Sequence, residues 1–305
     1  MKNKHYTDYS EYLSRFFDCK VQKISVNAGF TCPNRDGSKG VGGCTYCNNQ
    51  TFSPEYCKPK LTVTQQLEEG KVFFAKKYPM MKYLAYFQAY TNTYGDMAEL
   101  KTLYDEALAV DGVVGIVIAT RPDCVNRELL EYLGELGRKV KVIVEYGVET
   151  ANDETLTRIN RGHTWAESVE AIRLTHDSGL DCGAHLILGL PNETVADMMH
   201  TVEALSALPL STLKFHQMQI VKGTKLARQV TGGEVSVPKW TAEQYVELCS
   251  KIIRKIPRQI AIERFVSQSP ADLLISPKWG LKNYEFTNLL DNYLAANGIF
   301  QGDEL

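Results

Sequence analysis

Three cysteines in one glycine-rich stretch are the residues of this sequence best suited to chemistry. Cys32, Cys44 and Cys47 have the spacing C-x11-C-x2-C within residues 29–47. Three thiolates can bind three irons of a [4Fe-4S] cluster and leave the fourth iron without a protein ligand, whereas an electron-transfer cluster normally has four cysteines. This spacing is therefore compatible with a cluster whose fourth iron is open to a substrate or a cofactor.

The same cysteines allow two other kinds of site. A structural zinc site needs four ligands, and Cys57 could supply the fourth. A thioredoxin-like redox pair would use Cys44 and Cys47 alone and would leave Cys32 unexplained. Spacing by itself leaves the open cluster, the zinc site and the redox pair as alternatives.

Length and composition narrow the class of protein. A chain of 305 residues, 44% of them apolar, can bury one sizeable core, so one main domain is expected. A net charge of −2 argues against a uniformly basic nucleic-acid binder, although clusters such as residues 251–258 could form a local patch. The longest apolar run, residues 113–119, is too short to span a bilayer. With no apolar targeting segment at the start, we expect a soluble, cytoplasmic protein without a membrane partner.

The elements that must position the cysteines alternate between strand and helix patterns. Apolar, β-branched runs predict strands at residues 21–26, 83–88, 113–120, 140–146, 182–188 and 213–221. Helical patterns follow them at residues 64–77, 97–109, 127–137, 153–159 with 166–178, and 195–205. Strands that are apolar on both faces belong to parallel sheets covered by helices, and right-handed crossovers then give an α/β sheet, open or curled into a barrel. The cysteine loop follows the first strand, at the end where barrels place their active sites.

The pattern changes after about residue 222. A capping box at Thr241 and Gln244 begins another helix, a short apolar run covers residues 260–265, and a last helix is predicted at residues 282–296. We therefore divide the chain into an N-terminal segment (1–20), a β/α barrel (21–222) and a C-terminal extension packed on the barrel (223–305).

Several motifs resemble one family. The loop with aromatic Tyr46 just before the last cysteine resembles the radical S-adenosylmethionine (SAM) signature, and residues 27–37 resemble the YhcC/YtqA family, which is similar to the Elongator catalytic subunit. The resemblance extends to residues 145–163, 188–193, 221–226 and 277–280. It implies an α/β fold, a partial (β/α)6 radical SAM barrel with a C-terminal α/β extension. It also implies a [4Fe-4S] cluster on the three cysteines, with SAM as the second cofactor.

The resemblance assigns SAM-binding roles to three residues. It places Tyr46 near the adenine, Glu149 at the ribose-binding position and Arg161 near the SAM carboxylate. These roles suit the chemistry, because a carboxylate can accept both ribose hydroxyls and a guanidinium can bind a carboxylate through two parallel hydrogen bonds. Without the resemblance, the simpler interpretation is that Glu149 and Arg161 pair with each other or cap a helix.

Four further residues are implied as cofactor contacts. Leu190 lies in a turn whose exposed backbone meets the adenine in related enzymes, and His185 stands where some relatives carry an acid. The usual glycine-rich turn after the second strand is missing here. Gln88, Thr91 or the backbone is therefore expected to hold the amino group of SAM.

The Elongator resemblance also suggests a substrate. It implies hydrogen abstraction from a modified wobble uridine in the anticodon loop of tRNA, converting 5-carboxymethylaminomethyl-uridine to 5-aminomethyl-uridine, with a flavodoxin- or ferredoxin-type electron donor. Arg121 is predicted to pair with the substrate carboxylate, and Tyr86, Tyr90 and Tyr94 offer stacking faces. The alternatives are a radical SAM enzyme for a small-molecule or porphyrin-like substrate, and a non-catalytic, zinc-stabilised RNA-binding protein.

Overall fold

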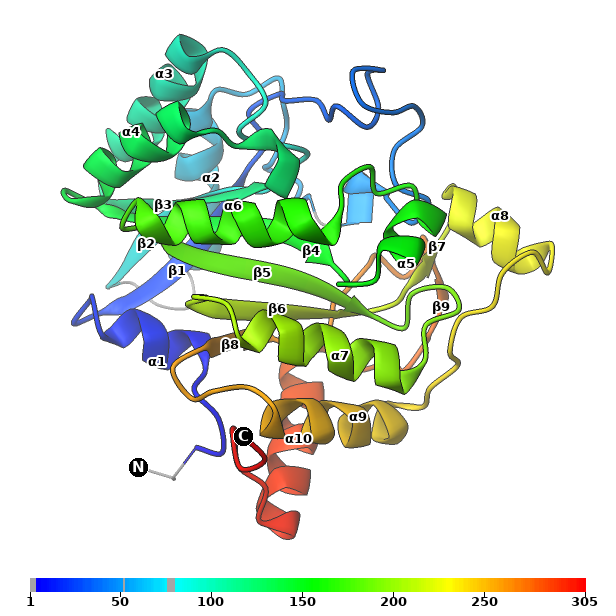
Figure 1. Cartoon of the computed structure of the whole chain (residues 1–305). Helices are drawn as coiled ribbons and strands as arrows, with labels where there is room; N and C mark the ends of the chain where they lie inside the picture. Colours follow the sequence, from blue (N-terminus) through cyan, green and yellow to red (C-terminus); the bar gives the residue numbers. More distant parts are fainter. Residues whose placement is uncertain (1–3, 52, 76–79) are drawn as a thin grey trace.

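A single curled parallel sheet forms the centre of the molecule (Figure 1). The computed structural model describes residues 4–51, 53–75 and 80–305. The sheet has seven parallel strands in the order β1-β2-β3-β4-β5-β6-β8. They are β1 (Lys20–Val26), β2 (Met81–Phe87), β3 (Val113–Thr120), β4 (Lys141–Glu149), β5 (Asp181–Leu188), β6 (Thr212–Gln217) and β8 (Ala261–Arg264).

Helices connect the strands and cover the outer face of the sheet (Figure 1). They are α2 (Val63–Ala75), α3 (Met97–Leu108), α4 (Arg127–Gly137), α5 (Asp153–Arg158), α6 (Trp165–Asp177) and α7 (Val195–Ser206), with short 3-10 turns η1 (Asn49–Thr51) and η2 (Pro122–Cys124). Capping boxes begin α6 at Thr164 and α7 at Thr194. The last residues of the first predicted helix, 76–77, lie outside the described residues.

Each strand presents two chemically different faces, because successive side chains point to opposite sides of a sheet. Outward side chains such as Val144, Tyr146 and Val148 of β4 join the main apolar core beneath the helices. The inward face carries charged and polar side chains among apolar ones, including Lys23, Glu145, His185 and Lys214. The strands are therefore less uniformly apolar than the sequence pattern suggests.

The last part of the chain completes the sheet. The run predicted at residues 260–265 forms β8, which pairs in parallel with β6 and adds a seventh strand. The strand predicted at 213–221 stops at Gln217, and β7 (Ile220–Val221) then pairs with β9 (Leu274–Ser276) in a separate antiparallel ribbon. Three further helices lie in this part: α8 (Lys225–Thr231), α9 (Ala242–Arg254) and α10 (Asn283–Asn297). The predicted α/β partial barrel is confirmed, with one strand more than the six expected.

The first helix lies between the two edges of the curled sheet. α1 (Tyr9–Ser14) contacts both β1 and β8, and Asp8 forms a β-bridge with Ile262 of β8 (Figure 1). No helix in the described ranges is long and apolar enough to cross a membrane.

Candidate active site

A cavity of about 260 Å³ opens on the inner face of the sheet, where the loops after the strands meet. It brings together ten of the eleven site residues predicted from the sequence. These are Cys32, Tyr46, Cys44, Cys47, Gln88, Thr91, Arg121, Glu149, Arg161 and His185.

Leu190 is the predicted site residue that does not line this cavity. Its side chain is fully buried in a small apolar cluster with Leu156, Ile159 and Ile187, against which Tyr46 packs. Its carbonyl accepts a hydrogen bond from the backbone N–H of Glu193. Leu190 thus supports the ring of Tyr46 from below.

Local hydrogen bonds fix the cysteine loop in place. The Cys32 carbonyl accepts from the Arg35 N–H at 2.7 Å, and the Cys44 carbonyl accepts from the Cys47 N–H at 3.1 Å. Gly43, with φ at +74°, makes the turn before Cys44. A Cβ on Gly43 would lie 2.9 Å from Nε of Arg35, so both the backbone conformation and the close contact favour glycine there.

The surroundings of the three cysteines fit an iron-sulfur cluster. Asn34 Nδ2 lies 3.7 Å from Cys44 Sγ, and Arg161 Nη1 lies 3.6 Å from the same sulfur. Such donors stabilise a thiolate and tune a bound cluster. Burial and the nearby Cys44 raise the pKa of Cys47, and bound iron would supply the charge that deprotonates it.

Cys57 is separate from this group. It is buried in the main apolar core, and burial raises the pKa of its thiol to about 12. Within the ranges the structure describes, no three His, Cys, Asp or Glu side chains converge on a position for a single metal ion. Cys57 does not line the cavity that the other three cysteines line, so the structure does not place it as the fourth ligand of a zinc site.

Glu149 and Arg161 both line the cavity and form an ion pair there. A register shift between Gly147 and Glu149 interrupts the pairing of β4 with β5, and Glu149 has φ at +70°. Such a bulge re-aims a side chain, here toward the cavity. Glu149 Oε1 accepts from the Tyr46 hydroxyl at 3.0 Å and lies 3.5 Å from Arg161 Nη2.

Arg161 is held tightly from several sides. Its Nη2 donates to the Gly147 carbonyl at 2.5 Å, and a Cβ on Gly147 would lie 2.5 Å from that nitrogen. Its buried Nε has no hydrogen-bond partner among the described residues. Although burial opposes its charge, Tyr46 and the Cys44 sulfur raise the pKa of Arg161 well above its usual range. The guanidinium is therefore a fixed positive charge beside the cysteine loop.

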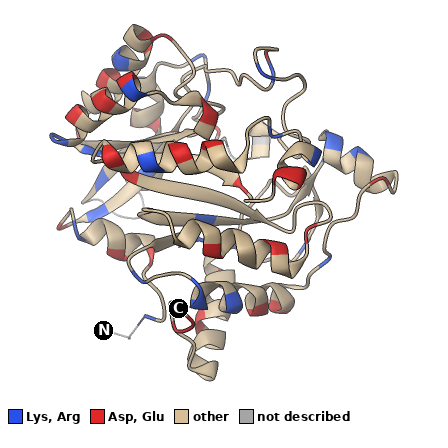
Figure 2. Cartoon of the chain, viewed as in Figure 1, with Lys and Arg blue, Asp and Glu red and all other residues tan. Residues whose placement is uncertain are grey.

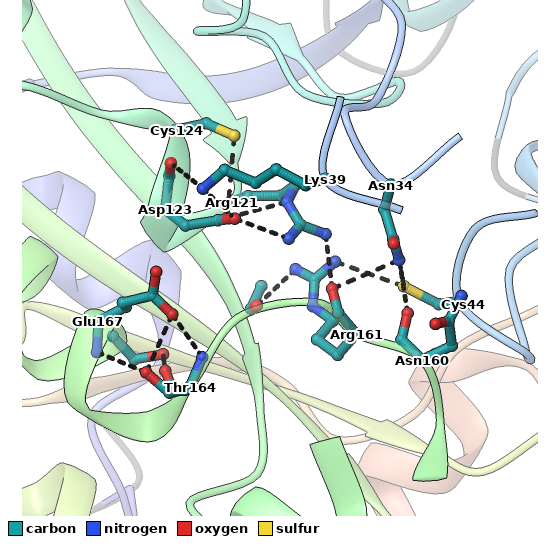
Figure 3. A network of polar contacts seen from close by, with 12 residues as sticks. Asn34, Lys39, Cys44, Arg121, Asp123, Cys124, Asn160, Arg161, Thr164 and Glu167 are labelled. Atoms are coloured by element: carbon teal, nitrogen blue, oxygen red, sulfur yellow. Dashed lines mark hydrogen bonds and ion pairs between the residues drawn. The ribbon is translucent and has the colours of Figure 1, made fainter. Parts of the chain in front are cut away.

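Arg121 lies behind Arg161, and its guanidinium is already engaged. Its Nε and Nη2 each donate to Asp123 at 2.9 Å, and its Nη1 donates to the Arg161 carbonyl at 2.7 Å (Figure 3). Lys39 Nζ also binds Asp123, at 2.7 Å. Burial raises the pKa of Asp123, but Arg121 and Lys39 outweigh it and hold this pKa at about 2. The pairing of Arg121 with a substrate carboxylate stays a prediction, and sequence reasoning missed Asp123.

The other predicted residues lie around the same cavity. Gln88 accepts from the Ser25 hydroxyl at 2.8 Å, whereas the buried hydroxyl of Thr91 has no partner among the described residues. His185 Nε2 lies 2.8 Å from Glu145, and burial with nearby Lys214 lowers its pKa. These contacts leave Thr91 the more available of the two candidates for the SAM amino group.

The three predicted stacking tyrosines are in different environments. Tyr90 lines the cavity, is 37% exposed and has φ at +65°. Tyr86 is buried, and its hydroxyl accepts from Lys214 at 3.0 Å. Tyr94 contacts Ser38 through its hydroxyl and is not among the residues that line the cavity. Tyr90 is thus the best placed to stack on a base.

A second group of charged and polar residues, some lining the cavity and others in contact with those that do, was missed from the sequence. Lys23 and Lys214 both bind Glu263, at 2.6 and 2.8 Å, and Glu145 contacts the same two lysines. Next to them, Arg264 and His216 line the cavity. Most of these residues are isolated polar positions within apolar runs. They therefore form no spacing pattern from which a site could be predicted.

Comparison with known proteins identifies the relatives of this chain. The family described as the radical SAM superfamily matches residues 29–205, and the radical SAM C-terminal domain matches residues 210–296. YtqA of Bacillus subtilis is 33% identical over 98% of this chain and 92% of its own. YhcC of Escherichia coli K12 is 34% identical over 96% and 93%. These matches confirm the family resemblance and the expected cofactors, a [4Fe-4S] cluster and SAM.

Two more distant relatives are an enzyme whose name refers to tRNA and a solved structure with the same fold. The tRNA uridine(34) acetyltransferase of Methanocaldococcus jannaschii is 26% identical over 61% of this chain and 34% of its own. The solved structure of Elp3 from Methanocaldococcus infernus has the same fold, with a TM-score of 0.70 at 18% identity over 93% of this chain and 64% of that one.

Proposed function

This chain belongs to the radical SAM superfamily and, within it, to the family of YtqA and YhcC, and from that premise we propose that it removes the carboxymethyl group from 5-carboxymethylaminomethyl-uridine in tRNA. The observation that supports the proposal is the sequence similarity to a protein named as a tRNA uridine(34) acetyltransferase.

The residues of the cavity divide the work of binding the cofactors. Cys32, Cys44 and Cys47 would hold the cluster, which when reduced supplies the electron that cleaves SAM and gives a 5′-deoxyadenosyl radical. Arg161 would hold the SAM carboxylate, and Glu149 would accept hydrogen bonds from the ribose. The Tyr46 hydroxyl, already bound to Glu149, would orient that carboxylate toward the ribose.

The net reaction balances without a further oxidant. The substrate loses two electrons when its N-carboxymethyl group and one water become a primary amine and glyoxylate. SAM gains two electrons when it becomes methionine and 5′-deoxyadenosine. The protein must therefore admit one water after hydrogen abstraction, and the cavity opens at the ends of the strands where this can occur.

The tRNA must present a flipped base to this cavity. Anticodon bases are accessible and commonly stack on aromatic side chains, and Tyr90 is exposed at the cavity with Arg35 5.9 Å from its ring centre. Figure 2 shows both signs of charge interspersed along the covering helices. We therefore place recognition at the cavity rim, and we propose a flavodoxin- or ferredoxin-type protein as the electron donor.

A reconstitution assay tests this function. Anaerobic holoenzyme, a reductant, SAM and tRNA bearing the carboxymethylaminomethyl nucleoside should give the aminomethyl nucleoside, 5′-deoxyadenosine and glyoxylate in equal amounts. Cys44→Ala protein and tRNA that lacks the modification are the controls. Cleavage of SAM with an untouched nucleoside would contradict the proposal and would direct attention to a small-molecule substrate.

A further inference from the structure

Two positively charged side chains that line the cavity, Arg35 and Arg264, have no carboxylate partner among the described residues, and of these Arg35 is exposed whereas Arg264 is half-buried. Arg161 faces Glu149, Arg121 binds Asp123, and the two inner lysines bind Glu145 and Glu263. Arg264, at the end of β8, makes no ion pair with any residue in the part of the chain that the structure describes. Its Nε is also buried without a hydrogen-bond partner there.

The neighbours of Arg264 are neutral hydrogen-bonding groups. Its Nη2 lies 3.1 Å from His216 Nδ1 and 3.5 Å from the Ser267 hydroxyl. Burial and the adjacent Arg264 lower the pKa of His216 well below its usual value, so this imidazole is uncharged. The positive charge of Arg264 is therefore not balanced locally, and an uncompensated charge in such a place favours an anionic ligand.

The segment that follows Arg264 is fixed against β6. Gln217 binds both the N–H and the carbonyl of Ser267, at 2.6 and 2.9 Å, and Gln219 binds the Ser267 carbonyl at 3.1 Å and the Ser269 hydroxyl at 2.6 Å. These contacts hold Arg264 and Ser267 at the cavity wall before any ligand arrives. Preorganised groups of this kind lose little freedom on binding.

We propose that Arg264, Ser267 and the neutral His216 form a subsite that binds a carboxylate of the substrate. This inference rests on the proposed function, and it identifies the side chain that would recognise the carboxymethyl group. The subsite lies on β6 and β8, the cysteine loop follows β1, and both line the same cavity. A base side chain bound between them would have its carboxylate on Arg264 and its C–H bonds toward SAM.

The test compares a carboxylate with its uncharged isostere. Wild-type holoenzyme should prefer tRNA bearing the carboxymethylaminomethyl group over the same tRNA bearing its primary amide by about 10- to 150-fold in kcat/KM, as a charge-assisted hydrogen bond implies. Arg264→Gln should bring this preference close to one while iron content and uncoupled SAM cleavage stay unchanged. Arg173→Gln, an exposed change on α6, is the matched control and should keep the wild-type preference.

Two further measurements keep the test decisive. Should Arg264→Gln fold poorly, Arg264→Lys and Ser267→Ala should each reduce the preference in part. Binding of the free nucleoside and its amide to unreduced, SAM-bound enzyme separates this subsite from the proposed reaction, because a preference lost in the variants supports the subsite even if no turnover occurs. The proposal is overturned if the Arg264 variants keep the wild-type preference for the carboxylate over the amide, and Arg264 would then bind RNA phosphate or no ligand. It is also overturned if the variants lose SAM cleavage as much as they lose this preference.

Discussion

The two ends of the cavity differ in how their charges are balanced. At the cysteine-loop end, Arg161 and Arg121 are each matched with a carboxylate of the chain. At the β8 end, Arg264 faces neutral His216 and Ser267. A cofactor that is the same in every turnover can be held by a rigid, internally balanced site, whereas an unbalanced charge gives affinity to a ligand that supplies the missing anion. The comparison supports the proposal that the first end binds SAM and the cluster and that the second end binds the substrate.

The largest effect is expected from the cluster ligands. Replacing Cys32, Cys44 or Cys47 with Ala should abolish the cluster and with it all SAM cleavage, because each replacement leaves one of the three thiolate-bound irons without its ligand. Cys57→Ala should keep the full iron content, since Cys57 lies in the apolar core. Measurement of iron and acid-labile sulfide after anaerobic purification checks this prediction. A full cluster in any one of the three variants would contradict the assignment of these cysteines as the cluster ligands.

The next effect concerns SAM binding at the same end. Arg161→Ala and Glu149→Ala should each weaken SAM binding by ~1.5–3 kcal/mol, the value of a charge-assisted hydrogen bond. Titration calorimetry on unreduced holoenzyme measures it. If both variants kept wild-type affinity for SAM, Glu149 and Arg161 would form only an ion pair with each other. This is the simpler interpretation that the sequence also permits.

The sequence predicted the cofactor end far better than the substrate end. The cysteines share one loop, so their spacing allowed an open cluster, and the family resemblance then assigned the cluster to them and SAM-binding roles to Glu149 and Arg161. Lys214 and His216 come from β6, within an apolar run, and Arg264 comes from β8. Their meeting depends on β8 pairing with β6, which is a contact between distant parts of the chain. No local pattern could have indicated it.

The fold was predictable for a related reason. Each βα unit carries its own periodicity, so six strands and their helices could be placed from the sequence. β8 has four residues and follows a long helical region, and its sequence looked like part of an extension rather than a strand of the main sheet. Asp123 escaped notice because an acid two residues after Arg121 is also typical of an exposed turn, and only the folded chain shows its contacts with Arg121 and Lys39.

A pH effect should come from a histidine at the cofactor end. Burial, with Arg161 and Arg121 nearby, lowers the pKa of His163 to about 2, and neither ring nitrogen has a partner among the described residues. In the unfolded chain this residue takes up a proton near pH 6.5, so stability falls as the pH falls from about 6.5 toward 2. At pH 5.5 this effect lowers the free energy of unfolding by ~1.4 kcal/mol relative to its value at neutral to slightly alkaline pH.

His163→Leu should remove this share of the acid sensitivity. His185 and His216, whose pKa values are also lowered, keep theirs in the variant. Urea unfolding at pH 7.5 and pH 5.5 compares the two proteins, and the variant should lose ~1.4 kcal/mol less between these pH values. If wild type and variant lost the same free energy of unfolding between these pH values, His163 would be protonated in the folded state as well. That result would contradict a cofactor end in which Arg161 and Arg121 are already paired with carboxylates.

The smallest effect separates the two ends most sharply. The sequence predicts that Arg121 pairs with the substrate carboxylate, so that Arg121→Lys would impair tRNA turnover more than uncoupled SAM cleavage. The geometry favours another outcome, because the Arg121 guanidinium binds Asp123 twice and supports the Arg161 carbonyl. A lysine keeps the charge but cannot make both bonds to Asp123. We therefore expect Arg121→Lys to weaken SAM binding by about 1 kcal/mol, and to lower SAM cleavage and tRNA turnover together by roughly fivefold at limiting SAM. Parallel assays of 5′-deoxyadenosine and of the aminomethyl nucleoside measure the two activities, with Arg264→Gln beside it as the variant in which they should separate. If Arg121→Lys lost tRNA turnover but kept SAM cleavage, the substrate carboxylate would instead bind Arg121 at the cysteine-loop end.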